Sequence, residues 1–292
     1  MGFDAFFFAR LDYKDKEKRM NDRSLEWVWM PNNDTLGNDV NVLAHTLYAH
    51  YSSPQGLNFD ILDNDEPWIN DKSSDTFNAE QRGEDFKNYL DVRCADYITD
   101  ECFVLFGDDF RYMNAMQNYE NMDAMISWMN EKYGDSYNLF YSTPSMYVDA
   151  LNATQATFPT KYDDMFPYAD CADCYWTGYF SSRANDKEYI RRASYNYDAS
   201  HQLYAEQVLN QNLTDDNVNE IMGARYHMLD VLGINQHHDA VTGTAKQAVA
   251  NDYAHKLFLG MEINKDVYSD AIERKISAKT GLTHENEWTQ CF

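Results

Sequence analysis

The sequence has no apolar run long enough to cross a bilayer, and it has little positive charge. Its longest apolar stretches, such as Ala5–Ala9 and Cys102–Phe106, hold about five residues, whereas a membrane helix needs about 20. The 292 residues carry 24 lysines and arginines against 48 aspartates and glutamates, a formal net charge of −24. A surface this acidic repels nucleic-acid phosphate and anionic lipid. We therefore expect no membrane span and no nucleic-acid partner; solubility alone accounts for the charge, which also suits a neutral substrate or an acidic compartment.

The sequence also lacks an even number of cysteines. There are five, which fits a free thiol or a partner outside this chain. Cys171 and Cys174 form a C-x-x-C pair, but no second pair completes a zinc knuckle. A local disulfide or two buried thiols is therefore favoured over a metal or redox role for this pair.

No signal peptide is present in the first 20 residues, because Ala5–Ala9 is too short for its apolar core and charged residues follow at once. Either the protein is cytosolic or its true N-terminus lies upstream of Met1. Three N-glycosylation sequons begin at Asn33, Asn152 and Asn212. They matter only if the protein is secreted, and chance alone can supply them in a chain rich in asparagine.

The first half of the chain alternates apolar runs with helical patterns. Ala5–Ala9, Cys102–Phe106 and Leu139–Tyr141 lack polar alternation, which is typical of strands covered on both faces. Asn114–Lys132 reads as a helix, and Pro144 begins another that a threonine precedes as N-cap. This order predicts an α/β domain with a mostly parallel sheet flanked by helices, N-terminally truncated, over residues 1–175.

The later part of the chain changes to purely helical patterns. Apolar residues recur at spacings of three and four over 197–208, 218–232 and 249–261. Three amphipathic helices predict a three-helix bundle domain over residues 176–275, followed by the start of a C-terminal region at 276–292. Either Thr242 or Thr244 is expected to cap the third helix.

Two polar segments are candidates for chemistry. Ligands of parallel sheets sit at the carboxyl ends of strands, where Arg10 and the pair Asp108–Asp109 are expected. Neighbouring strand residues point to opposite faces, so at most one of the two aspartates can act on a substrate. A loop cap or an ion pair with Arg111 is the simpler reading of that pattern.

The second segment, His237-His238-Asp239, lies in the loop between the last two helices. Imidazole and carboxylate groups bind zinc, but the loop has no H-x-H or H-E-x-x-H spacing, so a pair of loop histidines without metal is the simpler reading. Nothing in the sequence ties His45 or His50 to either segment. Aromatic residues, Tyr51 among them, cluster near turns and can stack on sugar rings, although most aromatic residues belong to cores.

Taken in order, these segments resemble glycoside hydrolase family 38, the retaining α-mannosidases of lysosomes and the Golgi. The matching stretches are Gly2–Asp4, Arg10–Lys16, Gly107–Tyr112, Tyr141–Ser145, Phe166–Asp170, Tyr175–Arg183 and Gln236–Thr244. The last two are the most specific together, and the resemblance covers nearly the whole chain. The stretches Arg10–Lys16 and Tyr141–Ser145 are closer to the lysosomal branch.

The resemblance implies a role for each of five residues. Asp109 would be the general acid/base, and His238 would be a ligand of one zinc ion. Asp239 would hydrogen-bond a mannose hydroxyl, Arg10 would stand beside the nucleophile, and Tyr51 would line the sugar site. Zinc would orient the mannose rather than generate hydroxide. Asp109 and His238 are then expected to converge on one sugar pocket.

The family's nucleophile, in an Asp-Pro-Phe-Gly-His stretch, and its N-terminal His-x-Asp are not in this sequence. The remaining zinc ligands would therefore lie outside this chain, and we expect residues 1–292 alone to be inactive and their N-terminus to be truncated. The resemblance implies mannose-containing oligosaccharides as substrates and a lysosomal, vacuolar or secreted full-length form. Two alternatives stay open: a carbohydrate-binding relic without metal, and an interaction fragment that forms a homo-oligomer.

Overall fold

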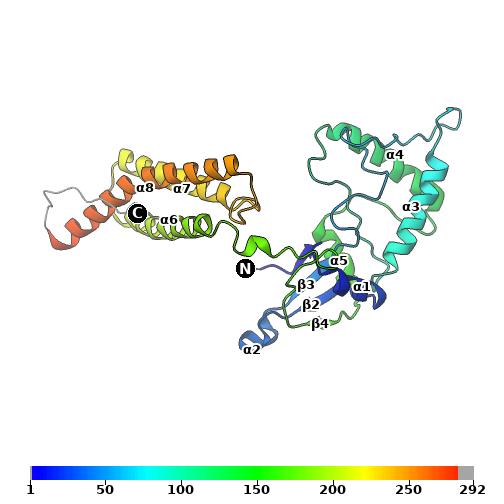
Figure 1. Ribbon diagram of the computed structural model, residues 1–292, viewed down its shortest axis with the longest axis horizontal. Coiled ribbons are helices and arrows are strands. Elements are labelled where there is room, and N and C mark those ends of the chain that lie inside the picture. Colours follow the sequence, from blue (N-terminus) through cyan, green and yellow to red (C-terminus); the bar gives the residue numbers. More distant parts are fainter. Residues whose placement is uncertain (1, 282–292) are drawn as a thin grey trace. The chain divides into compact units, whose positions relative to one another are not determined.

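The computed structural model describes residues 2–281, and none of the helices in that range is long and apolar enough to cross a membrane. The chain divides into two compact units, the first ending at Trp176 and the second beginning at Thr177 (Figure 1). The predicted C-terminal region, 276–292, falls largely on residues that are not described, and Cys291 lies among them.

The first unit contains a four-stranded sheet. Its strands are β1 (Ala5–Phe8), β2 (Glu26–Trp29), β3 (Val42–Thr46) and β4 (Thr160–Lys161), in the order β1-β3-β2-β4. β1 pairs with β3 and β2 pairs with β4 in parallel, whereas β2 and β3 are antiparallel. The sheet is therefore mixed, and the predicted α/β class is confirmed.

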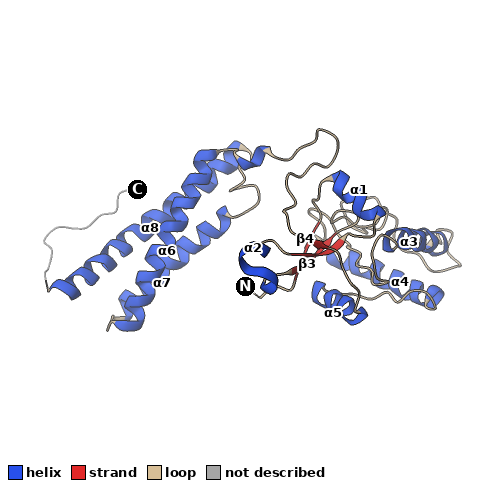
Figure 2. Cartoon of the chain, turned by 90° about the horizontal axis from the view of Figure 1, so that it is seen from below, coloured by secondary structure: helices blue, strands red, loops and turns tan. Residues whose placement is uncertain are grey.

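Five helical segments accompany this sheet. They are α1 (Tyr13–Asn21), α2 (Asn33–Leu36), α3 (Ala79–Cys94), α4 (Ala115–Tyr133) and α5 (Pro144–Thr154), with a short 3-10 turn at Gly37–Asp39. Figure 2 shows the sheet with α1 and α5 on opposite sides of it in that view. The helix predicted over Asn114–Lys132 is confirmed. So is the predicted cap, since Thr143 Oγ1 accepts a hydrogen bond from the Met146 N–H at 3.2 Å and Pro144 is the first helical residue.

The strand predicted at Cys102–Phe106 is wrong. Residues 102–106 form no strand, and two of their carbonyl groups bond to side chains instead of to a neighbouring strand. The guanidinium of Arg93 donates to the Phe103 carbonyl, and the Tyr112 hydroxyl donates to the Phe106 carbonyl at 2.8 Å. An apolar run alone cannot distinguish a paired strand from a segment held by side chains in this way.

The strand predicted at Leu139–Tyr141 is also wrong, for the same reason. The side-chain amide of Asn130 accepts from the Leu139 N–H at 2.8 Å and donates to the Leu139 carbonyl at 2.7 Å. An amide side chain that bonds both backbone groups takes the place of a strand neighbour.

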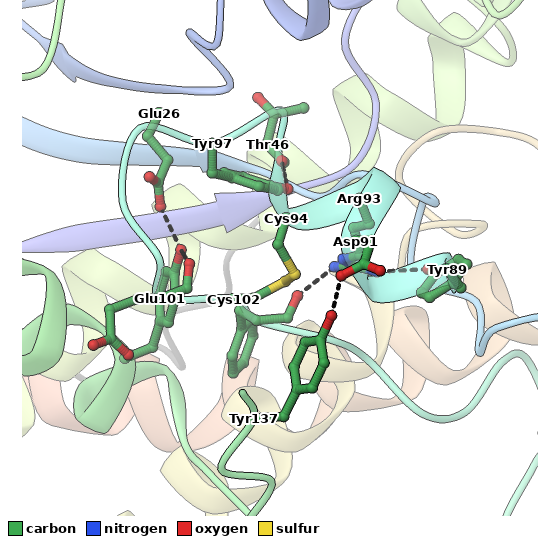
Figure 3. Close-up of a disulfide and its surroundings, with 12 residues drawn as sticks. Glu26, Thr46, Tyr89, Asp91, Arg93, Cys94, Tyr97, Glu101, Cys102 and Tyr137 are labelled. Atoms are coloured by element: carbon green, nitrogen blue, oxygen red, sulfur yellow. Dashed lines mark hydrogen bonds between the residues drawn. A yellow bond between two sulfur atoms is a disulfide. The ribbon is translucent and has the colours of Figure 1, made fainter. Parts of the chain in front are cut away.

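A disulfide joins Cys94, the last residue of α3, to Cys102 at the start of the segment 102–106 (Figure 3). Arg93 beside it is only 2% exposed, and its guanidinium also donates to the Tyr89 hydroxyl at 2.8 Å. A second disulfide joins Cys171 to Cys174. Of the two readings of that C-x-x-C pair, the local disulfide is therefore confirmed.

The second unit consists of three long helices, α6 (Ala184–Asn210), α7 (Asp215–Asn235) and α8 (Gln247–Thr280), after a 3-10 turn at Gly178–Phe180. Figures 1 and 2 show the three helices side by side. Each predicted helical stretch lies within one of them. Their shared core includes Ile190, Met228 and Leu257. The predicted cap of α8 is wrong, because its N-cap residue is Lys246 and no side chain caps it.

Candidate functional site

The loop Gly107–Tyr112 carries the candidate acid of the first unit. Both aspartates of the loop are exposed. The Asp109 N–H donates to Asp108 Oδ1 at 2.7 Å, and the Arg111 guanidinium donates to the Asp109 carbonyl at 2.8 Å. Asp108 thus bonds to backbone of its own loop, and a hydrogen bond from Ser52 is the main cause that keeps its pKa below the usual range. No hydrogen bond or ion pair within residues 2–281 occupies the Asp109 carboxylate, which remains available to a ligand.

His50 lies in the same neighbourhood, together with Arg10. Burial is the main cause that lowers the pKa of the His50 imidazole, and the positive charges of Arg10 and Lys16 lower it further. The carboxylates of Asp108 and Asp109 act in the opposite direction. The imidazole of His50 is therefore within electrostatic reach of both cations and both carboxylates. Sequence patterning misses His50, whose only signal is its position beside Tyr51.

Aromatic rings border this cluster. The Tyr51 and His50 rings lie 4.2 Å apart between centroids, and Tyr51 also raises the pKa of Tyr168, although burial is the main cause of that shift. The Tyr168 and Trp176 rings lie 5.7 Å apart, and the Arg10 guanidinium carbon sits 4.6 Å from the centre of the Trp176 ring. Within the first unit, Tyr51 lies against His50 and Arg10 lies against Trp176, so both belong to aromatic contacts of the kind that stack on sugar rings.

The second unit carries the other candidate cluster, in the loop between α7 and α8. His237 Nε2 lies 3.3 Å and His238 Nε2 lies 3.6 Å from Asp239 Oδ2. The other carboxylate oxygen of Asp239 accepts a hydrogen bond from Thr244 Oγ1 at 2.7 Å. This bond is the main cause that lowers the pKa of Asp239, and both imidazoles add to it. Thr244 therefore orients Asp239 instead of capping α8.

These three side chains form a donor set that fits a metal ion. Their nitrogen and oxygen atoms all lie within 4.8 Å of one another, and zinc takes these donors. His238 is 83% exposed, so its ring can turn toward further ligands. The only other such group in the described part of the chain contains Asp170, Cys171 and Cys174. The sulfur atoms of that group are joined in a disulfide and are not thiolate ligands.

A close backbone contact fixes the histidine loop. Gly243 has a φ of 76° and its carbonyl accepts from Ser182 Oγ at 2.9 Å and from the Arg183 guanidinium at 2.8 Å. The same guanidinium donates to the Ala245 carbonyl at 2.7 Å. The segment that enters α6 thus holds the far end of the loop, so the donor set sits on an ordered support.

Comparison with known proteins gives two family matches. Residues 1–171 match the glycosyl hydrolases family 38 N-terminal domain, and residues 174–274 match the alpha mannosidase middle domain. The chain is 38% identical over 276 residues to a probable alpha-mannosidase of Arabidopsis thaliana, covering 93% of this chain and 25% of that protein. It is 39% identical over 264 residues to a lysosomal alpha-mannosidase of Dictyostelium discoideum, covering 89% of this chain and 25% of that protein. It is 37% identical over 286 residues to the lysosomal alpha-mannosidase of Homo sapiens, covering 97% of this chain and 28% of that protein. The chain spans about a quarter of the length of these relatives.

Proposed function

This chain belongs to glycosyl hydrolase family 38, and from that membership we propose that the protein containing it is a retaining, zinc-dependent α-mannosidase. It removes terminal α-mannosyl residues from N-glycans, in a lysosome or vacuole, as the lysosomal names of several relatives suggest. The observation that carries the proposal is the match of two consecutive domains, each with its polar loop.

Asp109 is proposed as the general acid/base of this reaction. Its carboxylate is exposed, and the backbone on either side of it is fixed by hydrogen bonds, so it can approach a glycosidic oxygen. It first protonates the leaving oxygen and then deprotonates the water that releases the product. Arg10, whose charge acts on His50, and Tyr51, whose ring lies 4.2 Å from that imidazole, are proposed to bind the sugar and the charge that develops beside it.

His238 is proposed as a ligand of one zinc ion, whose other ligands lie outside residues 1–292. The bound ion would grip mannose hydroxyls and orient the ring. Asp239, held by Thr244 through one oxygen, offers its other oxygen to a mannose hydroxyl. Because this chain holds one of the two carboxylates that a retaining mechanism needs, we propose that residues 1–292 alone do not turn over substrate.

The test uses the full-length protein with Asp109→Asn, an α-linked mannose disaccharide as substrate, and zinc analysis. Loss of the general acid should lower kcat by about 10²- to 10⁴-fold and leave the zinc content unchanged. Asp71→Asn is the matched control, because Asp71 also accepts local hydrogen bonds, from Ser73, but lies on an exposed turn. Undiminished turnover by Asp109→Asn would reject the acid assignment.

A second measurement addresses the alternative of a binding relic without catalysis. If the full-length protein binds mannose in a calorimeter with the same affinity before and after chelation of metal, and hydrolyses no mannoside, the binding relic replaces the zinc-dependent proposal. A defined oligomer that shows no saccharide binding would support the interaction fragment instead.

A further inference from the structure

The acid loop Gly107–Tyr112 is fastened at both ends by one other segment, residues 53–63. At the first end, the Gly107 N–H donates to Ser53 Oγ at 2.6 Å, and the Ser53 N–H donates back to the Gly107 carbonyl at 2.9 Å. At the second end, the Tyr112 N–H donates to Asp60 Oδ2 at 2.7 Å. The position of Asp109 between these ends therefore depends on a segment about 50 residues earlier in the chain.

Asp60 is an unusual side chain for such a place, because it is a carboxylate only 1% exposed. Besides the Tyr112 N–H it accepts the Leu62 N–H at 3.1 Å and the Asn118 amide at 3.2 Å. Burial alone would raise its pKa, but these three hydrogen bonds outweigh burial and hold the pKa below the usual range. A buried carboxylate raises the free energy of the folded state unless hydrogen-bond donors surround it. The folded state therefore requires the hydrogen bonds between Asp60 and the loop.

A neighbouring carboxylate completes the fastening. Asp63 receives two hydrogen bonds from the Arg111 guanidinium, at 2.6 and 3.1 Å. The same guanidinium donates to the carbonyl of Asp109 at 2.8 Å. The Asp63 N–H donates to the Asp60 carbonyl at 3.0 Å, so both carboxylates belong to one turn. Because Asp63 already fixes the planar guanidinium of Arg111, the further hydrogen bond to the Asp109 carbonyl costs little conformational entropy.

The loop needs this support because its backbone is strained. Phe110 and Tyr112, on either side of Arg111, have φ values of 62° and 66°. Bulky residues adopt this left-handed region only where the surroundings over-determine it. The Phe110 side chain is 81% exposed, so its own packing does not hold the conformation. The bonds at Tyr112 tie this end of the loop to the rest of the fold: its N–H donates to Asp60, and its hydroxyl donates to the Phe106 carbonyl.

We propose that Asp60 is a positioning residue: by holding the Tyr112 N–H, it keeps the strained loop, and with it the Asp109 carboxylate, in the geometry that delivers a proton to the leaving oxygen. Asp63 supports the same geometry through Arg111. The catalytic part of this inference rests on the proposed function of Asp109. The structural part, that Asp60 holds the loop, stands independently of it.

The first measurement is hydrogen exchange of the full-length protein, in the peptide that covers residues 107–113. Asp60→Asn keeps the shape of the side chain but removes its charge, and exchange in this peptide should accelerate about 10- to 100-fold. Peptides from α5 should be unaffected, which separates a loosened loop from global destabilisation. Asp71→Asn, the matched surface control, should leave the loop peptide unchanged.

The second measurement compares two substrates that need the acid to different degrees. The sugar leaving group of a mannose disaccharide departs only when the glycosidic oxygen is protonated, whereas 2,4-dinitrophenolate departs without a proton. Asp60→Asn should lower kcat/KM for the disaccharide about 10- to 100-fold and for 2,4-dinitrophenyl α-mannoside only slightly, with zinc content unchanged. If Asp60→Asn does not fold, Asp63→Asn is used, because it loosens Arg111 at a partly exposed position and should give the same substrate pattern.

Equal losses on both substrates, or unchanged exchange in the 107–113 peptide, would overturn the positioning role. If the wild-type full-length protein hydrolyses neither mannoside, the proposed function fails, and the exchange comparison still decides whether Asp60 holds the loop.

Discussion

His45 Nδ1 lies 2.9 Å from Glu26 Oε1, and both side chains are almost completely buried, at 0% and 1% exposure. The two residues are direct partners in the antiparallel pairing of β2 with β3. The Tyr147 hydroxyl donates to the same Glu26 oxygen at 2.8 Å, and the Tyr97 ring stacks on the imidazole with its centroid 5.2 Å away. The centre of the small sheet is therefore polar and titratable.

This pair makes the first unit sensitive to acid. Burial is the main cause that lowers the pKa of His45 below its ordinary value near 6.5; Arg93 lowers it further, and Glu26 opposes both. As the pH falls, His45 takes up a proton in the unfolded chain before it does so in the folded protein. The stability of the folded state is therefore unaffected by this group above pH 6.5, and it decreases as the pH falls from there toward the pKa of His45 in the folded state. We expect the urea midpoint of the protein to fall between pH 7.5 and pH 5.

His45→Gln should weaken that pH dependence even though it lowers stability at pH 7.5. His255→Gln, which replaces an exposed histidine of α8, should keep the wild-type slope. A His45→Gln slope equal to that of the wild type would show that the acid sensitivity comes from other groups. The measurement is urea unfolding followed by tyrosine and tryptophan fluorescence.

Lys16 on α1 is a partly buried cation that costs stability. Burial is the main cause that lowers its pKa to about 8, with a contribution from the charge of Arg93. Between pH 10.5 and pH 8, Lys16 is protonated in the unfolded chain but largely neutral in the folded protein. The free energy of unfolding therefore decreases as the pH falls through this range. Lys16→Met gives a side chain of similar shape without the charge and should raise the free energy of unfolding at pH 7 by about 1–3 kcal/mol. The gain should shrink at pH 9.5.

The control for this prediction is Lys18→Met on the same helix. Lys18 is exposed and pairs with Asp22 at 2.8 Å, and exposed pairs contribute little. Thermal unfolding of the three proteins at both pH values gives the comparison. A Lys16→Met protein that is less stable than the wild type at pH 7 would mean that the ammonium has a partner in the folded state.

The sequence predicts five of the helices, because their signals are local, but it gives no prediction for α1, α2 or α3. Apolar spacing locates α4, α6, α7 and α8, and the Thr143-Pro144 pair marks the first residue of α5. The strands are harder to predict, since an apolar run such as Cys102–Phe106 carries no information about whether a neighbouring strand exists. The polar interior of β2 and β3 hides those strands from the same patterns.

In the candidate site, too, local sequence signals are predictable and contacts between distant segments are not. Family resemblance makes Asp109 and His238 the candidate residues, and the C-x-x-C spacing indicates the Cys171–Cys174 disulfide. His50, Asp60 and the Cys94–Cys102 disulfide escape notice because their roles arise from contacts between segments, which the order of residues does not encode. The role of Asp60 in particular appears only when the hydrogen bonds of its carboxylate are counted.

Gly243 is expected to tolerate no side chain. A Cβ at this position would lie 2.5 Å from the Ser182 carbonyl oxygen, which is backbone and cannot move aside, and the φ of 76° adds strain. Gly243→Ala should destabilise the helical unit by about 1–4 kcal/mol. Gly223→Ala is the matched control, because Gly223 lies within α7 with nothing within 4 Å of an added Cβ. That substitution should stabilise the helix. Thermal unfolding measured by circular dichroism tests both, and a Gly243→Ala protein as stable as the wild type would contradict the close contact.

The histidine loop offers two imidazoles to a metal, and substituting each separately distinguishes them. His238 is 83% exposed against 43% for His237 and stands further from Asp239, at 3.6 against 3.3 Å. His237 is therefore the ring more engaged within the loop, and we propose the more exposed His238 as the zinc ligand. In the full-length protein, His238→Ala should lower zinc affinity by more than about tenfold, and His237→Ala should lower it less. Elemental analysis after dialysis against a graded series of a zinc chelator measures both, with His255→Ala as the control. Since this readout is independent of turnover, the reverse order would transfer the ligand role to His237, and normal zinc content in both variants would place the metal site on other residues.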